Sequence, residues 1–205
     1  MSAHIPTLER VRPLRTETSR PGRCEVEAAF RTIIRWAGDD PGRDGLIKTP
    51  SRMARAFEEA FAGYAQDPVE LLQTTFEESE GYDEMIMLRG IRFESHCEHH
   101  MAPIAGQAWV AYVPSGRVVG ISKLARVVEV YAKRLQIQER LTVQIANAID
   151  HVLKPQGVGV LIKATHHCMT VRGVRKPGSD LVTSRMLGCF RDNPLTRQEF
   201  LALAV

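Results

Sequence analysis

Residues 107–119 read QAWVAYVPSGRVV, and this stretch decides the fold class. Residues 107–113 are rich in β-branched and aromatic side chains, which favour a strand. Residues 114–117 have the composition of a tight turn, and Val118–Val119 resumes the strand pattern. The stretch therefore predicts strands joined by a short turn.

Further strands are predicted before and after this stretch, and two helices are predicted between it and the later strands. The first helix is expected to open at Ser122 as its N-cap, and the second to stop before Pro155. A last short helix is expected from the capping-box spacing of Thr196 and Glu199. Further strands are predicted at 85–88, 91–94, 158–164, 169–174 and 181–190. Runs of strands interrupted by one helix pair predict an α+β fold with a largely antiparallel sheet.

The N-terminal third has a different character. Residues 24–79 are expected to form a helical region, with a helix over 25–37 and a second one starting at Thr49 as N-cap and Pro50 as the first helical residue. Residues 1–23 carry five Arg against two Glu and no apolar run, which predicts a disordered tail. Residues 80–205 are then the expected catalytic domain.

Composition narrows the class of protein. The chain has 205 residues, a net charge of +3 and no apolar run near the roughly 18 residues that span a membrane. The charge is too mild for a nucleic-acid-binding face. Four cysteines without an export signal indicate a reducing compartment, so we expect a cytoplasmic protein without nucleic-acid or membrane partners. Because no P-loop motif is present, a bound nucleotide would be held in another way.

Two His/Cys clusters carry the candidate chemistry. Residues 95–100 read SHCEHH, and His166-His167-Cys168 follows the apolar strand pattern of 158–164. Thiolate and imidazole ligands together are typical of zinc. A catalytic zinc keeps three protein ligands and leaves one position for water, whereas a structural zinc takes four. Cys189 could supply a fourth ligand, although its position in a predicted strand favours a buried apolar role.

Several motifs, in order and spacing, resemble those of the GTP cyclohydrolase I family. The resemblance runs from about residue 25 to the C-terminus and rests on Cys97–His100, Gly120–Arg126, Gln138–Thr142, His166–Met169 with Arg172-Gly173, Val182–Gly188 and Thr49-Pro50 with Arg52. It implies the tunnelling fold (T-fold), zinc as cofactor, GTP as substrate, and a homodecamer with active sites at subunit interfaces. Allosteric regulation is compatible with it.

The resemblance also implies roles for individual residues. Zinc ligands would be Cys97, His100 and Cys168, with His99 and His166 as the acid/base pair. Substrate-binding residues would be Gln138 and Glu139 at the guanine edge, Ile121, Ser122, Lys123 and Arg172 around the ribose and triphosphate, and Arg126, Arg52 and Arg55 reaching a neighbouring subunit's site.

The implied reaction opens the purine ring of GTP. Zinc would make water nucleophilic at neutral pH, and a histidine would supply the proton that the ring nitrogen needs. Loss of formate and a ribose rearrangement would then give 7,8-dihydroneopterin triphosphate. Two alternatives remain: a pterin- or nucleotide-binding relative with a structural zinc, and a T-fold zinc hydrolase acting on another purine.

Overall fold

The computed structural model describes residues 20–73, 75–76 and 81–204. Its chain divides into two compact units, Met1–Ala60 and Phe61–Val205. This division falls at residue 60, whereas the sequence analysis continued the N-terminal region to residue 79. Residues 1–19, on which most of the expected disordered tail falls, lie outside the described residues.

The first unit is a pair of helices, α1 (Arg23–Trp36) and α2 (Thr49–Ala60). Their apolar faces meet through Phe30 and Phe57, whose ring centroids lie 5.2 Å apart in an edge-to-face arrangement. Gly38 follows the end of α1 with a φ of +95°, a conformation that glycine adopts without steric cost. Both helices expected in this part of the chain are therefore confirmed, but α2 begins at Thr49, so the prediction of Thr49 as N-cap is wrong.

The second unit is built on a five-stranded sheet with the strand order β5-β2-β3-β6-β7. The strands are β2 (Ile86–Cys97), β3 (Pro103–Val113), β5 (Leu135–Gln136), β6 (Gly157–His166) and β7 (Leu181–Gly188). Neighbouring strands pair antiparallel except for the short parallel pair of β2 and β5. The predicted strands 85–88 and 91–94 form one strand, β2, whose register shifts between Leu88 and Ile91. The predicted α+β class with a largely antiparallel sheet is confirmed.

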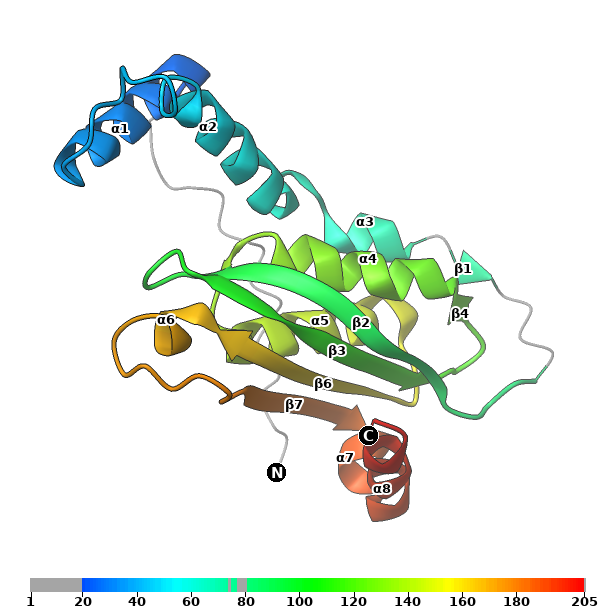
Figure 1. Ribbon diagram of the computed structural model, residues 1–205. Helices are drawn as coiled ribbons and strands as arrows, with labels where there is room; N and C mark the ends of the chain where they lie inside the picture. The colour runs from blue at the N-terminus through cyan, green and yellow to red at the C-terminus, as the bar shows by residue number, and fades with distance from the viewer. Residues whose placement is uncertain (1–19, 74, 77–80, 205) are drawn as a thin grey trace, which may run out of the picture. The chain divides into compact units, whose positions relative to one another are not determined.

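One face of this sheet is covered by two helices, α4 (Ile121–Ala132) and α5 (Gln138–Leu153), as Figure 1 shows. Alternate residues of β3, namely Ala108, Val110 and Tyr112, point to this side because successive side chains of a strand face opposite ways. They pack with the buried stripes of the two helices, which include Leu124 and Ile145. This layer forms the larger apolar core.

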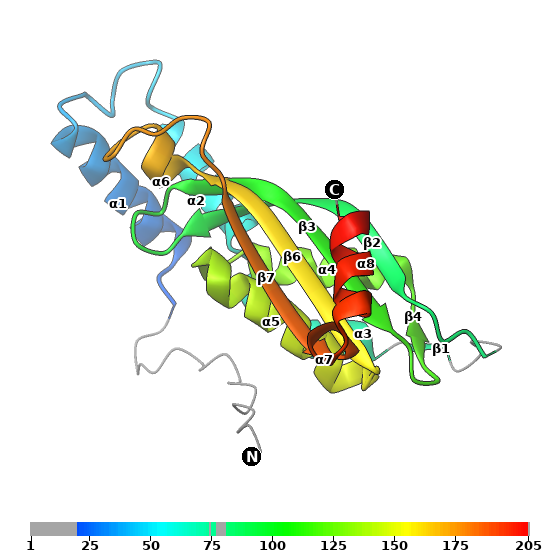
Figure 2. The same cartoon turned by 90° about the horizontal axis from the view of Figure 1, so that it is seen from below.

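The opposite face carries a smaller core under the C-terminal helices. α7 (Cys189–Asp192) lies against β6 and β7, and α8 (Pro194–Leu203) packs against α7 on the same face, as Figure 2 shows. Phe190 and Phe200 are fully buried there, with ring centroids 5.6 Å apart. Gly159 of β6 faces both rings, and a Cβ at this position would come within 2.8 Å of Phe190.

Small elements complete the second unit. They are the 3-10 helix η1 (Ala62–Ala65), α3 (Pro68–Leu72), and the paired strands β1 (Thr75–Phe76) and β4 (Val118–Val119). The buried Arg134 joins η1 to α4 by donating hydrogen bonds to the backbone oxygens of Gly63 and Val130, each at 3.1 Å. Among the described residues, no helix has the length and apolar character needed to cross a membrane.

Several local predictions for the second unit are wrong. The strand predicted at 181–190 ends at Gly188, and Cys189 and Phe190 begin α7. Residues 169–174 do not form a strand, because α6 (His167–Thr170) begins directly after β6. The apolar residues that alternate in this segment, Met169, Val171 and Val174, are exposed. Helix α4 begins at Ile121 with Gly120 as N-cap, so Ser122 lies inside its first turn. Helix α8 is capped by Asn193, whose side chain accepts a hydrogen bond from the Leu195 amide at 2.9 Å. Thr196 is therefore a helical residue and not a cap.

Candidate metal centre and active site

Three predicted ligands converge at one end of the sheet. Cys97 ends β2, His100 lies in the turn that follows, and Cys168 lies in α6 just after β6. Strands β2 and β6 both pair with β3, which brings their ends together. The ligand atoms of the three residues all lie within 4.8 Å of one another, and Cys97 Sγ is 3.9 Å from His100 Nδ1.

A tight backbone turn presents the first two ligands. The Cys97 amide donates to the Ala102 carbonyl and the Met101 amide donates to the Cys97 carbonyl, each at 2.8 Å. Met101 has a φ of +52°, which an L-residue adopts at a cost. Cys168 lies in the short helix α6, which brings it next to Cys97 and His100. The sequence pattern predicts a strand after Cys168 and not this helix.

The electrostatics of the cluster suit a cation. Burial raises the pKa of Cys168, and the neighbouring Cys97 raises it further. Two thiolates side by side therefore need a positive charge between them. Two sulfurs and one imidazole nitrogen form the donor set of a zinc site with three protein ligands. Among the described residues no fourth His, Cys, Asp or Glu joins the group, and Cys189 lies at the far end of β6 beside Gly157.

His166, at the end of β6, is held by a buried glutamine. Its Nε2 lies 2.8 Å from Oε1 of Gln138, the first residue of α5. Nε2 of Gln138 in turn donates to the Ile162 and Leu181 carbonyls at 3.2 and 2.9 Å, and to Thr183 Oγ1 at 3.1 Å. All polar atoms of the Gln138 side chain are thus engaged by the protein. Burial lowers the pKa of His166, and the Glu139 carboxylate opposes this effect.

Three more predicted site residues surround the cluster. His99 is exposed, and its Nδ1 lies 3.8 Å from Cys97 Sγ. Glu139, in the first turn of α5, is also exposed and lies close enough to His166 to act on its charge. Arg172, in the turn after α6, lies near enough to lower the pKa of Cys168 against the stronger effect of burial. These side chains form a group that is open to a ligand.

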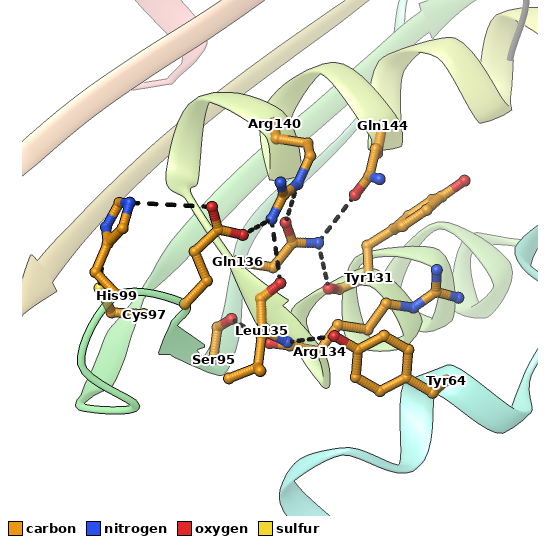
Figure 3. A network of polar contacts seen from close by, with 11 residues as sticks. Tyr64, Ser95, Cys97, His99, Tyr131, Arg134, Leu135, Gln136, Arg140 and Gln144 are labelled. Atoms are coloured by element: carbon orange, nitrogen blue, oxygen red, sulfur yellow. Dashed lines mark hydrogen bonds and ion pairs between the residues drawn. The ribbon is translucent and has the colours of Figure 1, made fainter. Parts of the chain in front are cut away.

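Sequence reasoning gave no role to Arg140, although it lies inside one of the quoted motifs. Its guanidinium is ion-paired with Glu98, in the turn between Cys97 and His100, and donates to Gln136 Oε1 and the Leu135 carbonyl, each at 3.2 Å. Figure 3 shows this network between β5 and the start of α5. The Glu98 amide also donates to the Gln136 carbonyl at 3.0 Å. The metal-ligand turn is therefore fastened to β5 at two points.

Other predicted substrate-binding residues lie elsewhere. Ile121, Ser122 and Lys123 lie in the first turn of α4, which follows β4. The other end of α4 leads into β5, which pairs with β2 at Cys97. A 12-residue helix is about 18 Å long, so this turn and the cluster do not meet within one chain. Arg126 lies further along α4, and Arg52 and Arg55 are exposed on α2 in the first unit.

This fold and this site define a class of protein: an α+β enzyme with a three-ligand candidate metal centre beside histidines that can transfer protons. The sequence model of GTP cyclohydrolase I matches residues 26–205. The GTP cyclohydrolase 1 of Brucella abortus (strain S19) is 53% identical over 184 residues, covering 90% of this chain and 86% of that protein. That of Brucella canis is 52% identical over the same shares. The chain belongs to the GTP cyclohydrolase I family.

Family membership confirms the resemblance and the T-fold assignment. A more distant similarity is that to the archaeosine synthase QueF-Like in the apo form, a solved structure with 22% sequence identity and a TM-score of 0.43. It covers 51% of this chain and 93% of that one.

Proposed function

We propose that this chain hydrolyses GTP at C8 of the purine, releases formate and forms 7,8-dihydroneopterin triphosphate, the first step of folate and pterin biosynthesis. Membership of the GTP cyclohydrolase I family supports this reaction. The observation that carries the proposal is the convergence of Cys97, His100 and Cys168 beside His166 and Glu139. The cluster and its neighbours combine a site for a cation, a proton-transferring group and an acceptor for the guanine edge.

Cys97, His100 and Cys168 would hold zinc through two sulfurs and one ring nitrogen. When bound, zinc would lower the pKa of water to about 7 and so supply a hydroxide nucleophile at neutral pH. The protein's own contribution is to hold the three donor atoms together, two at the turn after β2 and one in α6. A bound cation would compensate the repulsion between the two thiolates.

His166 and His99 would move the protons of the ring opening. Addition of water at C8 shifts an electron pair to N7, and later cleavage shifts one to N9, so each nitrogen needs a proton donor. An imidazole suits this role because its ordinary pKa lies near neutral pH. The lowered pKa of His166 favours the neutral ring, which also allows it to accept a proton from water before donating it.

Glu139 would recognise the guanine. Its exposed carboxylate lies in the first turn of α5, next to His166. A carboxylate can accept hydrogen bonds from the guanine N1–H and from the exocyclic amine at the same time, since the two donors lie side by side. This contact would hold the purine with its imidazole ring toward the histidine.

The triphosphate would be bound by residues from more than one copy of the chain. Arg172 lies near the cluster, but Ile121, Ser122 and Lys123 lie at the far end of α4. We infer that a neighbouring copy contributes these residues, and also Arg126, Arg52 and Arg55, so that the sites form at interfaces of a homo-oligomer, a decamer by family resemblance. We place this assembly in the cytoplasm.

The test is incubation of the purified, zinc-loaded protein with GTP. We expect equimolar formate and, after oxidation, a fluorescent pterin. Cys97→Ser should abolish metal binding and formate release together. Cys24→Ser is the matched control, because Cys24 is exposed on α1 and is not one of the three clustered ligands.

The outcomes separate the alternatives. GTP binding without formate would reject the proposed reaction and favour a binding protein with a structural metal. Formate without the pterin would favour a hydrolase that stops at a ring-opened product. Formate release that survives Cys97→Ser would remove the cluster from the mechanism.

A further inference from the structure

We propose that Gln138 is a positioning residue that fixes the tautomer of His166, so that Nε2 keeps a permanent proton and Nδ1 is the atom that exchanges protons with the substrate. This inference rests on the proposed acid/base role of His166. It replaces the guanine-reading role that the sequence analysis gave to the Gln138 side chain.

The first step is the orientation of the Gln138 amide. One end of this amide faces two backbone carbonyl oxygens, those of Leu181 at 2.9 Å and Ile162 at 3.2 Å. A carbonyl oxygen only accepts hydrogen bonds, so this end must be the NH2 group. Since Gln138 is 1% exposed, the reversed amide would bury three oxygens against one another without a proton between them. The orientation is therefore set by chemistry, and Oε1 faces His166.

A pair of threonines fixes the remaining hydrogen-bond directions. Thr142 Oγ1 lies 2.7 Å from the Gln138 carbonyl oxygen and must donate to it. Thr183 Oγ1 lies 2.7 Å from Thr142 Oγ1, whose hydrogen is already used, so Thr183 donates to Thr142. The Thr183 oxygen then accepts from Gln138 Nε2 at 3.1 Å. The two hydrogens of Gln138 Nε2 are shared among three acceptors, the two carbonyls and Thr183, and the hydroxyl hydrogens of Thr142 and Thr183 each have one direction.

The consequence falls on His166. Gln138 Oε1 can only accept, so at 2.8 Å the His166 Nε2 must carry a hydrogen. A neutral imidazole has one N–H, which leaves the lone pair on Nδ1. Among the described residues no group is hydrogen-bonded to Nδ1 of His166, and this atom is not one of the buried polar atoms without a partner. Nδ1 is therefore reachable by a ligand.

The proton transfers then balance around one ring. The imidazolium, with hydrogens on both nitrogens, gives the Nδ1 proton to a purine nitrogen and becomes the neutral tautomer that Gln138 stabilises. The same Nδ1 takes up a proton from the attacking water to restore the imidazolium. Nε2–H stays on Gln138 Oε1 throughout, so the ring does not need to rotate between the two steps.

The direct test is 15N solid-state NMR of the zinc-loaded protein labelled with 15N-histidine, recorded without substrate at a pH where His166 is neutral. His166→Asn assigns the signals, since the chain has seven histidines. We expect a pyrrole-type signal for Nε2 and a pyridine-type signal for Nδ1. The reverse pattern, or an average of the two tautomers, would overturn the proposal. This measurement does not need turnover. The proposed tautomer can therefore be refuted while formate release is observed, and it can be confirmed while formate release is absent.

A kinetic test separates positioning from guanine reading. Gln138→Leu should lower kcat roughly 10- to 100-fold, the range found when the partner that orients a metal-bound histidine is removed. The KM for GTP should change little, whereas loss of a guanine contact would raise KM. Gln156→Leu is the matched control, because Gln156 donates to the Pro114 carbonyl at 3.0 Å just before β6, at the opposite end of that strand from His166. A raised KM with unchanged kcat in Gln138→Leu would refute the positioning role.

Discussion

Arg140 offers the sharpest test of how the metal-ligand turn is held. The guanidinium joins Glu98, between Cys97 and His100, to Gln136 and the Leu135 carbonyl of β5. Arg140→Met keeps the aliphatic part of the side chain and removes all of these bonds. The turn would then depend on its backbone hydrogen bonds alone, so its ligands should spend more time away from the geometry that binds a cation.

The expected loss of stability is modest. The two side chains of the ion pair are 41% and 32% exposed, and a pair so accessible to water contributes about 0.2–1 kcal/mol. The bonds to Gln136 and Leu135 contribute roughly 0.5–1.5 kcal/mol each. A total of about 1–4 kcal/mol is less than the roughly 5–15 kcal/mol that keeps a domain folded. The variant should therefore fold, which lets its metal affinity be measured.

Metal affinity should fall more than stability suggests. Removing a group that orients a metal ligand costs about 10- to 100-fold in affinity, and we expect that range for zinc binding to Arg140→Met in competition with a chromophoric chelator. Urea unfolding of the metal-free protein measures the change in the free energy of unfolding separately from the change in zinc affinity. Arg43→Met is the matched control, since Arg43 forms an exposed ion pair with Asp39 at 2.7 Å in the first unit. Wild-type zinc affinity in Arg140→Met, or an equal loss in the control, would refute the reasoning.

Three further predictions concern other parts of the second unit and the assembly. Burial raises the pKa of Tyr131 to about 12, so the unfolded chain loses this proton first. Tyr131 should therefore lower the free energy of unfolding by about 1.4 kcal/mol per pH unit from about pH 10 to 12, and Tyr131→Phe should lack this contribution. Phe190→Ala should cost about 3–5 kcal/mol in urea unfolding, whereas the exposed Leu195→Ala should stay within about 0.5 kcal/mol. Mixed and reassembled Lys123→Ala and Cys97→Ser subunits should regain formate release that neither has alone; no recovery would contradict sites shared between copies.

The sequence was sufficient for most of the fold because its signals are local. The stripes of α1 and α2, the turn at 114–117 and the helix pair each follow from spacing within a few residues. The strand order needed more than the sequence, since β5 is two residues long and pairs parallel with β2. Such a short pair has no periodicity of its own, and only the packing of α4 and α5 places it there.

The difference between local sequence signals and long-range contacts also explains which parts of the candidate site could be predicted. The cluster of Cys97, His100 and Cys168 could be predicted because thiol and imidazole together have few structural uses in a protein with reduced cysteines. The strand expected at 169–174 was wrong because alternation was counted without a partner strand, and Val171 and Val174 are 70% and 61% exposed. The bonds of Gln138 and Arg140 were out of reach because their partners lie 28 and 42 residues away.

These partners explain why the start of α5 matters to both halves of the chemistry. The chain leaves α4, forms β5 alongside Cys97, and enters α5 at Gln138. Within this short connection, Gln136 and Arg140 hold the turn of the metal ligands, and Gln138 holds His166 and the carbonyls of β6 and β7. The candidate metal cluster and the proposed proton-transferring ring of His166 are thus anchored to the same helical turn. Because α5 is itself fixed by a fully buried apolar stripe, the distance between them is set by the larger core and not by the exposed turns that carry the ligands.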